Sequence, residues 1–314
     1  MVKLPLQTAQ YEYLERGFKE WLDILGFADT TVYNLPHIAR ELMHFLEGRS
    51  VTAIQAVTQK DMKAYYKYIN QRSNQRRGGG LSDNYIHKHM QAIERFLEYL
   101  HHRGIKTLAG TGVRLTAPAR KQITVLTTDE IKLLFTATTK TAISGHVNPA
   151  YYEAAQARDR AMLTIYYSCG LRRTEGVHLN TDDINFDTRL MHVRKGKNYK
   201  ERFVPFGKAS SAQLQEYIYD HRPHLLADSR HRRLFVSYGG RNMTGGTLNT
   251  RLQSLQLASE DITLQEKEVT LHILRHSIAT HLLAAGMSLE KIAKFLGHGT
   301  MDSTQIYTHL LEQV

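Results

Sequence analysis

The chain has 314 residues and a formal net charge of +11. This length can form two domains with separate cores, and the excess of lysine and arginine indicates an anionic partner, most commonly nucleic acid. The first ten residues, MVKLPLQTAQ, have no apolar run behind a basic start, and no later segment approaches a membrane span, so we expect neither a secretory signal nor membrane insertion. The single cysteine, Cys169, cannot form an internal disulfide, which fits a reducing cytoplasm.

The first hundred residues predict four helices, each with an apolar stripe at helical spacing. The fourth is the clearest, because Ser82 is a suitable N-cap and Gly104 a suitable stop. We therefore expect a small antiparallel helical bundle over residues 1–105. The stripes are Leu14, Phe18, Leu22 and Leu25; Val32, Leu35, Ile38, Leu42 and Phe45; Met62, Tyr66 and Ile69; and Ile86, Met90, Ile93, Leu97 and Leu100.

Two polar segments interrupt this helical pattern. The loop QRSNQRRGGG, before the fourth helix, carries Arg72, Arg76 and Arg77. Both a flexible surface loop and a loop that contacts phosphate fit this composition. Residues 106–122, KTLAGTGVRLTAPARKQ, combine Gly, Pro and Thr with little apolar periodicity, and are predicted to be a linker.

Residues 123–314 predict a second, mainly helical domain. Helical signal resumes at Thr127 and Glu130, which have the spacing of a capping box. Residues 189–206 predict a small antiparallel sheet, with 234–237 as a further candidate strand. A group of arginines follows, for which phosphate contact is the favoured interpretation over an ordinary solvated surface: Arg230, Arg232, Arg233, Arg241 and Arg251.

The C-terminal region concentrates groups that can act on a phosphodiester. In LHILRHSIATHLLAAG, His272 and Arg275 are one helical turn apart, so both side chains can project to one face. A second short helix ends before His298, and Tyr307 lies on a third helical piece. Together these residues supply a cation, two imidazoles and a phenol, which suffice for attack on a phosphodiester without a metal.

A single histidine or tyrosine would carry little weight, since the chain has 17 of each. A second constellation upstream changes this. SCGLRRTEGVHL contains Arg172 and Glu175, and LMHVRKGKNYKERFVPF places Lys197 between two strand-like segments. This second group of residues favours a chemical role for the histidines and the tyrosine over an ordinary surface or half-buried one.

With these residues in view, the chain resembles the tyrosine recombinases of the phage-integrase and Xer type. GLRRTE at 170–175 resembles the family's G-L-R-x-[ST]-E box. HILRHS at 272–277, LGH at 296–298 and Tyr307 resemble H-x-x-R-H-S, L-G-H and the nucleophile, while GKNYKER at 196–202 resembles the hairpin that carries a catalytic lysine. The resemblance spans roughly residues 125–310, and several boxes in the right order make it specific.

The resemblance implies a helical, SAM-like core-binding domain followed by a mainly helical catalytic domain. It further implies that Tyr307 attacks the scissile phosphate and forms a 3′-phosphotyrosyl bond, while Arg172 and Arg275 clamp the phosphate oxygens. Lys197 would protonate the leaving oxygen, His272 would assist the proton of the nucleophile, and His298 would hydrogen-bond the phosphate. Glu175 would orient Arg172.

The lysine assignment leaves an alternative open. Asn198 stands where the family usually has glycine, and a one-residue slip of the hairpin would favour Lys195 over Lys197. Lys200 and Arg202 are expected to contact DNA phosphate from the same basic turn, as are Arg72, Arg76, Arg77 and Arg241 elsewhere.

The resemblance implies double-stranded DNA with inverted half-sites as partner, a homotetramer on DNA, a monomer or weak oligomer in its absence, and a Holliday-junction intermediate. Accessory DNA-bending or directionality proteins would fit the class, as would a cytoplasmic, nucleoid-associated location. No cofactor is expected, because a phosphotyrosyl ester retains the energy needed to rejoin the strand. No metal site is expected, and for His276 and His281 packing is favoured over metal binding.

The chain departs from the family pattern in places. Gly176 replaces an apolar residue after the glutamate, which is expected to loosen packing behind Arg172. Only seven residues follow Tyr307, so the usual C-terminal tether between protomers is in doubt, and an N-terminal arm-binding domain is not expected. Two alternative functions remain: a DNA-binding regulator that no longer cuts, and a tyrosine topoisomerase that relaxes supercoils.

Overall fold

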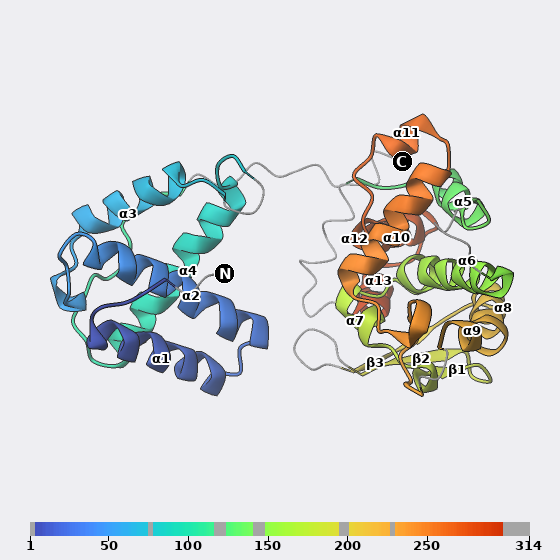
Figure 1. Ribbon diagram of the computed structural model, residues 1–314, viewed down its shortest axis with the longest axis horizontal. Coiled ribbons are helices and arrows are strands. Elements are labelled where there is room, and N and C mark those ends of the chain that lie inside the picture. The colour runs from blue at the N-terminus through green and yellow to red at the C-terminus, as the bar shows by residue number, and fades with distance from the viewer. Residues whose placement is uncertain are drawn as a thin grey trace. The chain divides into compact units, whose positions relative to one another are not determined.

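The computed structural model describes residues 4–74, 78–115, 124–140, 148–194, 201–226 and 230–297. The chain divides into two compact units, Met1–Lys121 and Gln122–Val314, and each is described by itself (Figure 1). The predicted fold class is confirmed: the chain is mainly helical and carries one small antiparallel sheet. Among the helices in these ranges, none combines the length and apolarity that crossing a membrane would demand.

The first unit is a bundle of the four predicted helices. They are α1 (Ala9–Ile24), α2 (Asp29–Glu47), α3 (Gln59–Gln71) and α4 (Asp83–His102), with a 3₁₀ turn at Ile54–Ala56. The local signals act as expected: the Ser82 side chain accepts a hydrogen bond from the Tyr85 amide, and Gly104 has a φ of 71° just after α4 ends. The stripes meet in one core, in which Phe18 packs edge-on against Phe96.

The start of the predicted linker belongs to this bundle. Leu108, Val113 and Leu115 pack against its core, and the Thr111 amide donates to Glu94 Oε1 at 2.9 Å. The described part of the predicted linker, residues 106–115, therefore packs on the bundle without forming a helix or a strand.

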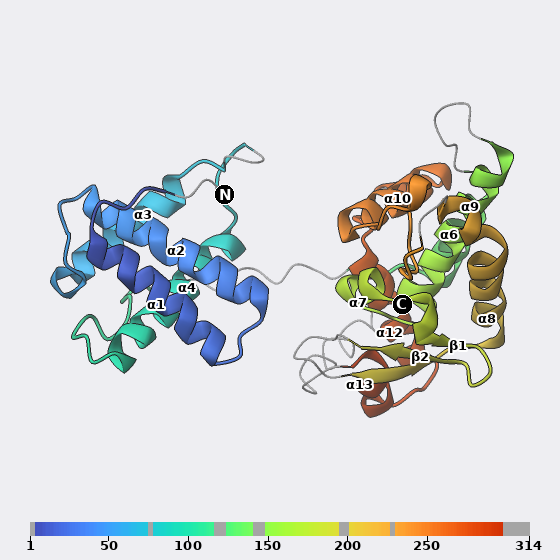
Figure 2. The same cartoon turned by 60° about the horizontal axis from the view of Figure 1, so that its bottom comes forward.

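The second unit surrounds a large core with helices, has a smaller apolar cluster between α12 and α13, and places the sheet at its margin (Figures 1 and 2). The sheet has the order β1 (Ile184–Asn185), β2 (Leu190–Val193) and β3 (Arg202–Pro205), and Val193 pairs with Arg202. The helices are α5 (Thr128–Ala137), α6 (Pro149–Leu163), α7 (Arg173–His178), α8 (Lys208–Gln215), α9 (Arg222–Leu226), α10 (Gly245–Ala258), α11 (Ile262–Gln265), α12 (Leu271–Ala284) and α13 (Leu289–Leu296), with a π-helical turn, η2 (Thr164–Ser168), after α6.

The candidate strand at 234–237 is not part of this sheet. Leu234, Phe235 and Val236 are buried, but in the described part of the chain this region forms only isolated bridges, such as Val236 with Asn242. The third strand is β1. In sequence, a short apolar run fits a strand and a buried connection equally well. Here packing within the helical core makes it a buried connection.

Gly176 does not loosen the packing behind Arg172, contrary to the expectation from sequence. Tyr166, from η2, is fully buried there and donates from Oη to the Arg173 carbonyl oxygen at 3.1 Å. A Cβ at Gly176 would lie 2.5 Å from Tyr166 Oη and 2.6 Å from its Cζ. The tyrosine ring thus fills the volume that an apolar side chain at 176 would otherwise occupy.

We therefore expect Gly176→Ala to destabilise the protein by about 1–3 kcal/mol, because the buried ring must shift to admit a methyl group. Gly246→Ala is the matched control: an added Cβ would meet its nearest neighbour, Thr244 Oγ1, at 3.6 Å. It should be neutral or stabilise by up to about 1 kcal/mol. Urea unfolding of both variants measures this, and equal stability would contradict the packing role of Tyr166.

Candidate active site

The site is organised around the carboxylate of Glu175, whose side chain has no exposed surface. Gly170 has a φ of 59°, which turns the chain from η2 into α7. Arg172 then occupies the N-cap of α7, and its backbone N–H donates to Glu175 Oε2 at 2.8 Å. This backbone hydrogen bond holds the Glu175 carboxylate at the first turn of α7 independently of any side-chain donor.

Three guanidinium groups meet at this carboxylate. Arg172 Nη1 donates to Glu175 Oε1 at 2.7 Å, which is the pairing expected from their spacing. Arg202, from β3, donates to both oxygens, at 2.8 and 2.9 Å. Arg275 Nη1, from α12, lies 4.0 Å from Glu175 Oε2. Arg172 and Arg275 therefore share one site, as the sequence required.

The same three arginines hold the C-terminal end of α13. Arg202 Nε donates to the carbonyl oxygen of residue 295 at 3.3 Å, Arg275 Nη2 to that of residue 296 at 2.7 Å, and Arg172 Nη2 to that of residue 297 at 2.6 Å. These carbonyls lack partners within the helix and carry the negative end of its dipole, so cations suit them. The end of α13 is thus fixed directly on the cluster of arginines.

Arg275 is the most enclosed of the three. Only 2% of the residue is exposed, and Nη1 also donates to the Gly170 carbonyl oxygen at 2.6 Å. Ser277, on the same helix, is buried and accepts a hydrogen bond from the Leu126 amide at 2.9 Å. The serine of the H-x-x-R-H-S box therefore joins α12 to the start of the second unit.

The electrostatics keep Glu175 charged. Burial by itself raises the pKa of Glu175, but hydrogen bonds and charge from Arg202, followed by those of Arg172, outweigh burial and lower it to about 2. The carboxylate is therefore ionised throughout the neutral range, and it offsets part of the positive charge around it.

His272 is exposed at the first turn of α12, and its ring lies 4.9 Å from that of His276, centroid to centroid. Partial desolvation, followed by the cations of Arg275 and Arg172, lowers the pKa of His272 below its ordinary 6.5. Burial, then His272 and Arg275, lowers the pKa of His276 to about 4. Both rings therefore favour the neutral form near pH 7, in which an imidazole can accept a proton.

Several predicted site residues lie outside the described residues: Arg76, Arg77, Lys195, Lys197, Lys200, His298 and Tyr307. Of the remaining ones, Arg72 pairs with Glu41 at 2.8 Å between Nε and Oε1, and Arg241 is exposed. Within the described ranges, no group of His, Cys, Asp and Glu side chains has an arrangement that could hold a metal ion. His281 Nδ1 instead lies 2.9 Å from the Tyr167 hydroxyl.

Arg202 differs most from its expected position. We expected it on a solvated basic turn, yet only 11% of its side chain is exposed and it donates to Glu175. The alternation of buried and exposed residues along β3 indicates this position, because Arg202 lies on the same face as buried Val204, two residues further on. Side chains two positions apart in a strand share a face, so the Arg202 side chain points inward.

Comparisons with known proteins agree with this geometry. Residues 124–313 match the family model described as "Phage integrase family". The tyrosine recombinase XerD of Listeria innocua is 30% identical over 279 residues, which cover 86% of each chain. The tyrosine recombinase XerD of Pseudomonas putida is 40% identical over 163 residues, which cover 52% of this chain and 53% of that protein.

Solved structures show the same fold. A Tn1549 transposon integrase in complex with circular intermediate DNA aligns with a TM-score of 0.67 at 18% identity over 94% of both chains. The XerH site-specific recombinase bound to its difH substrate aligns with a TM-score of 0.65 at 20% identity, covering 96% of this chain and 83% of that one. The matched family model and the XerD relative thus define a recombinase of the tyrosine class. The chain belongs to the phage integrase family, and its activity is site-specific recombination.

Replacement of Glu175 by Gln should destabilise the protein by about 3–5 kcal/mol at neutral pH, because it leaves buried cations without their counter-charge. The pKa of Glu175 is depressed from 4.5 to about 2, so its contribution is complete above pH 4.5 and is lost as the pH falls towards 2. Urea unfolding of the full chain at pH 7 and at pH 3 should therefore show a larger difference between variant and unmodified protein at pH 7.

Asp159→Asn is the matched control, since Asp159 is also fully buried and pairs with Arg158 and Arg251 away from this site. It should lose stability but keep its rate of DNA strand cleavage, whereas Glu175→Gln should lose both. Equal cleavage rates for the two variants would show that Glu175 has a purely structural role.

Proposed function

We propose that the chain cuts and rejoins double-stranded DNA with Tyr307 as nucleophile and Arg172, Lys197, His272, Arg275 and His298 as its partners. The Tyr307 oxygen attacks the scissile phosphorus, and the bond to the 5′-oxygen breaks, which yields a 3′-phosphotyrosyl ester and a 5′-hydroxyl. The observation that carries this proposal is the meeting of Arg172 and Arg275 at Glu175.

The two arginines stabilise the charge that develops on the phosphate. Guanidinium remains charged at every relevant pH and donates two hydrogen bonds in one plane. The Arg172 contacts with Glu175 and Gly297 account for two of its five N–H donors. In comparable oxyanion sites, removal of one donor costs roughly 10²–10³ in rate.

The proton transfers need a base and an acid. A free phenol has a pKa of about 10, so Tyr307 requires help to lose its proton at neutral pH. His272 accepts it, because partial desolvation and the cations of Arg275 and Arg172 lower the pKa of the imidazole and favour its neutral form. Lys197 donates a proton to the leaving 5′-oxygen, and His298 hydrogen-bonds a phosphate oxygen. Lys195 is the alternative to Lys197 in this role.

The covalent ester makes the reaction reversible without a cofactor. A 5′-hydroxyl from a second duplex attacks the phosphotyrosyl bond, and successive exchanges pass through a Holliday junction. Inverted half-sites would place protomers in pairs, and two pairs would form a tetramer on DNA. Integration, excision, inversion and dimer resolution then differ in the arrangement of the DNA sites, and accessory DNA-bending proteins would bias the outcome at the nucleoid.

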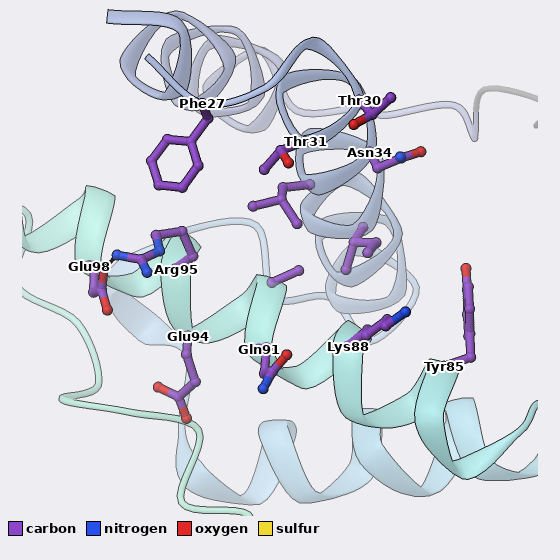
Figure 3. A pocket seen from close by; sticks show the side chains of 13 residues that line it. Phe27, Thr30, Thr31, Asn34, Tyr85, Lys88, Gln91, Glu94, Arg95 and Glu98 are labelled. Atoms are coloured by element: carbon purple, nitrogen blue, oxygen red, sulfur yellow. Dashed lines mark hydrogen bonds and ion pairs between the residues drawn. The ribbon is translucent and has the colours of Figure 1, made fainter. Parts of the chain in front are cut away.

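A groove in the first unit is the candidate surface for reading bases. It lies between α2 and α4, has a volume of about 760 Å³, and is lined by Thr30, Asn34, Lys88 and Gln91 among others (Figure 3). Amide and ammonium groups of this kind hydrogen-bond base edges in the major groove of DNA, whereas lysine also contacts phosphate. The net charge of +11 favours association with such an anionic partner.

Tyr307→Phe should keep DNA affinity and form no covalent adduct, because the phenylalanine ring has no oxygen to attack phosphorus. A DNA duplex with a nick beside the scissile phosphate traps the adduct, which is resolved on a denaturing gel. Tyr238→Phe, which alters an exposed tyrosine of the same unit, is the control that should still form it. An adduct in Tyr307→Phe would overturn the assignment.

The same pair of proteins tests the choice of function on a plasmid that carries two candidate sites. A recombinase produces new junctions between the sites, a topoisomerase relaxes the plasmid without them, and a regulator does neither. Only new junctions that require Tyr307 support the proposal.

Lys88 and Gln91, on the same face of α4, should respond differently to substitution. If Lys88 contacts phosphate, Lys88→Met lowers affinity for all sequences and reduces the slope of log K against log salt by about 0.9. If Gln91 reads an adenine, Gln91→Ala lowers the preference for the cognate site by about 1–3 kcal/mol and leaves the slope unchanged. Binding titrations at several salt concentrations measure both, and unchanged values would exclude the groove as a DNA surface.

A further inference from the structure

Arg202 is the arginine of the cluster to which the proposed chemistry assigns no role. We propose that Arg202 is a positioning residue for strand cleavage, which holds Glu175, and through it Arg172, in a fixed relation to the end of α13. The inference rests on the proposed function, since it concerns how the phosphate-binding arginine is oriented.

The first argument is the way in which the Glu175 carboxylate is shared. Arg202 donates to Oε1 at 2.8 Å and to Oε2 at 2.9 Å, a two-point contact that fixes the plane of the carboxylate. Arg172 then donates to Oε1 at 2.7 Å. Arg172 by itself holds the carboxylate through its backbone N–H and through Nη1, and Arg202 adds two further hydrogen bonds from a separate element, β3. Arg202 thus ties the pair of Arg172 and Glu175 to the sheet and limits its displacement.

The second argument is the close approach of Arg202 to the end of α13. Arg202 Nε donates to the Phe295 carbonyl oxygen, and Figure 2 shows α13 beside β3. A Cβ at Gly297 would lie 2.7 Å from Arg202 Cδ and 2.8 Å from its Nε. Gly297 also has a φ of 67°, so glycine is required there for both conformation and space. Arg202 therefore lies directly against Gly297, the residue that precedes His298 in sequence, and is hydrogen-bonded two residues before it.

The third argument is the position of Arg202 in the chain. It is the first residue of β3 and pairs with Val193, the last residue of β2. Residues 194–201, including Lys197, connect this pair in sequence. One side chain therefore links the strand that follows Lys197 with the helix that carries Arg172 and the helix that precedes His298.

A direct contact between Arg202 and DNA phosphate is the competing interpretation. It requires donors that point away from the cluster, but in the described structure Nε, Nη1 and Nη2 each donate within it, to the Phe295 carbonyl oxygen and to both oxygens of Glu175. The two roles predict different measurements. A phosphate ligand contributes to affinity and to its salt dependence, whereas a positioning residue contributes to the rate at saturating DNA.

The experiment compares Arg202→Met and Arg202→Lys with the unmodified chain in single-turnover cleavage of nicked DNA, well below the thermal midpoint of each protein. Arg202→Met should cleave roughly 10²-fold more slowly at saturating DNA, because small displacements of an aligned group cost that much. Its dissociation constant and salt slope should not change. Arg202→Lys keeps the charge but cannot make the two-point contact, so its rate should be intermediate.

Arg194→Met is the matched control. Arg194 directly follows β2 and pairs with Asp183, with 57% of its side chain exposed, so the same substitution there should leave the cleavage rate unchanged. If Arg202→Met folds too poorly to assay, the cleavage rate of Arg202→Lys tests the positioning role instead. A rate within twofold of the unmodified chain, or a salt slope reduced by about 0.9 with an unchanged rate, would overturn the positioning role.

A double-mutant cycle separates positioning from general stabilisation. If Arg202 acts through Glu175, then Arg202→Met combined with Glu175→Gln should cleave no more slowly than the slower single variant. Rate losses that multiply would show that the two residues act independently and would overturn the proposal. Adduct formation by the unmodified chain tests the proposed function itself. If that adduct forms normally and the Arg202 variants cleave at unchanged rates, only the positioning role of Arg202 is rejected.

Discussion

The buried carboxylate of Glu175 is the interaction on which the catalytic unit depends. One negative charge faces the guanidinium groups of Arg172, Arg202 and Arg275, so the cluster keeps an excess of positive charge. Burial of unpaired cations is costly, and here backbone carbonyl oxygens at the end of α13 offset part of that cost. The remaining charge favours an anion, and a phosphodiester is one with the right geometry for arginine.

This arrangement also explains how distant parts of the chain reach one place. Arg172 and the Gly297 carbonyl oxygen that accepts its hydrogen bond are 125 positions apart. The end of a helix is a compact group of aligned acceptors, and three arginines from α7, β3 and α12 can share it only if all three elements are correctly packed. Folding of the core and assembly of the site are therefore coupled.

The features that sequence predicted well are the local ones. Ser82 and Thr127 cap their helices as expected, since a cap needs only residues within one turn. The pairing of Arg172 with Glu175 is equally local. The expectation of loose packing at Gly176 failed because a residue outside its own helix, Tyr166, fills the space beside it. The packing of residues 106–115 likewise depends on the helices of the bundle and not on their own spacing. We expected Arg202 on the surface because we gave the basic composition of the surrounding turn more weight than the alternation of residues along its strand.

The arginines of this protein show why composition overstates contact with DNA. Arg40, Arg158 and Arg222 are all less than 9% exposed, and each donates to a protein carbonyl oxygen. For Arg222 the desolvation is strong enough to lower its pKa, although guanidinium remains charged. These residues add to the net charge of +11, but each is engaged within the protein away from Glu175. Arg275 is just as buried, yet it lies at the Glu175 cluster, so the position of a buried arginine, and not its burial alone, bears on whether it can serve the proposed site.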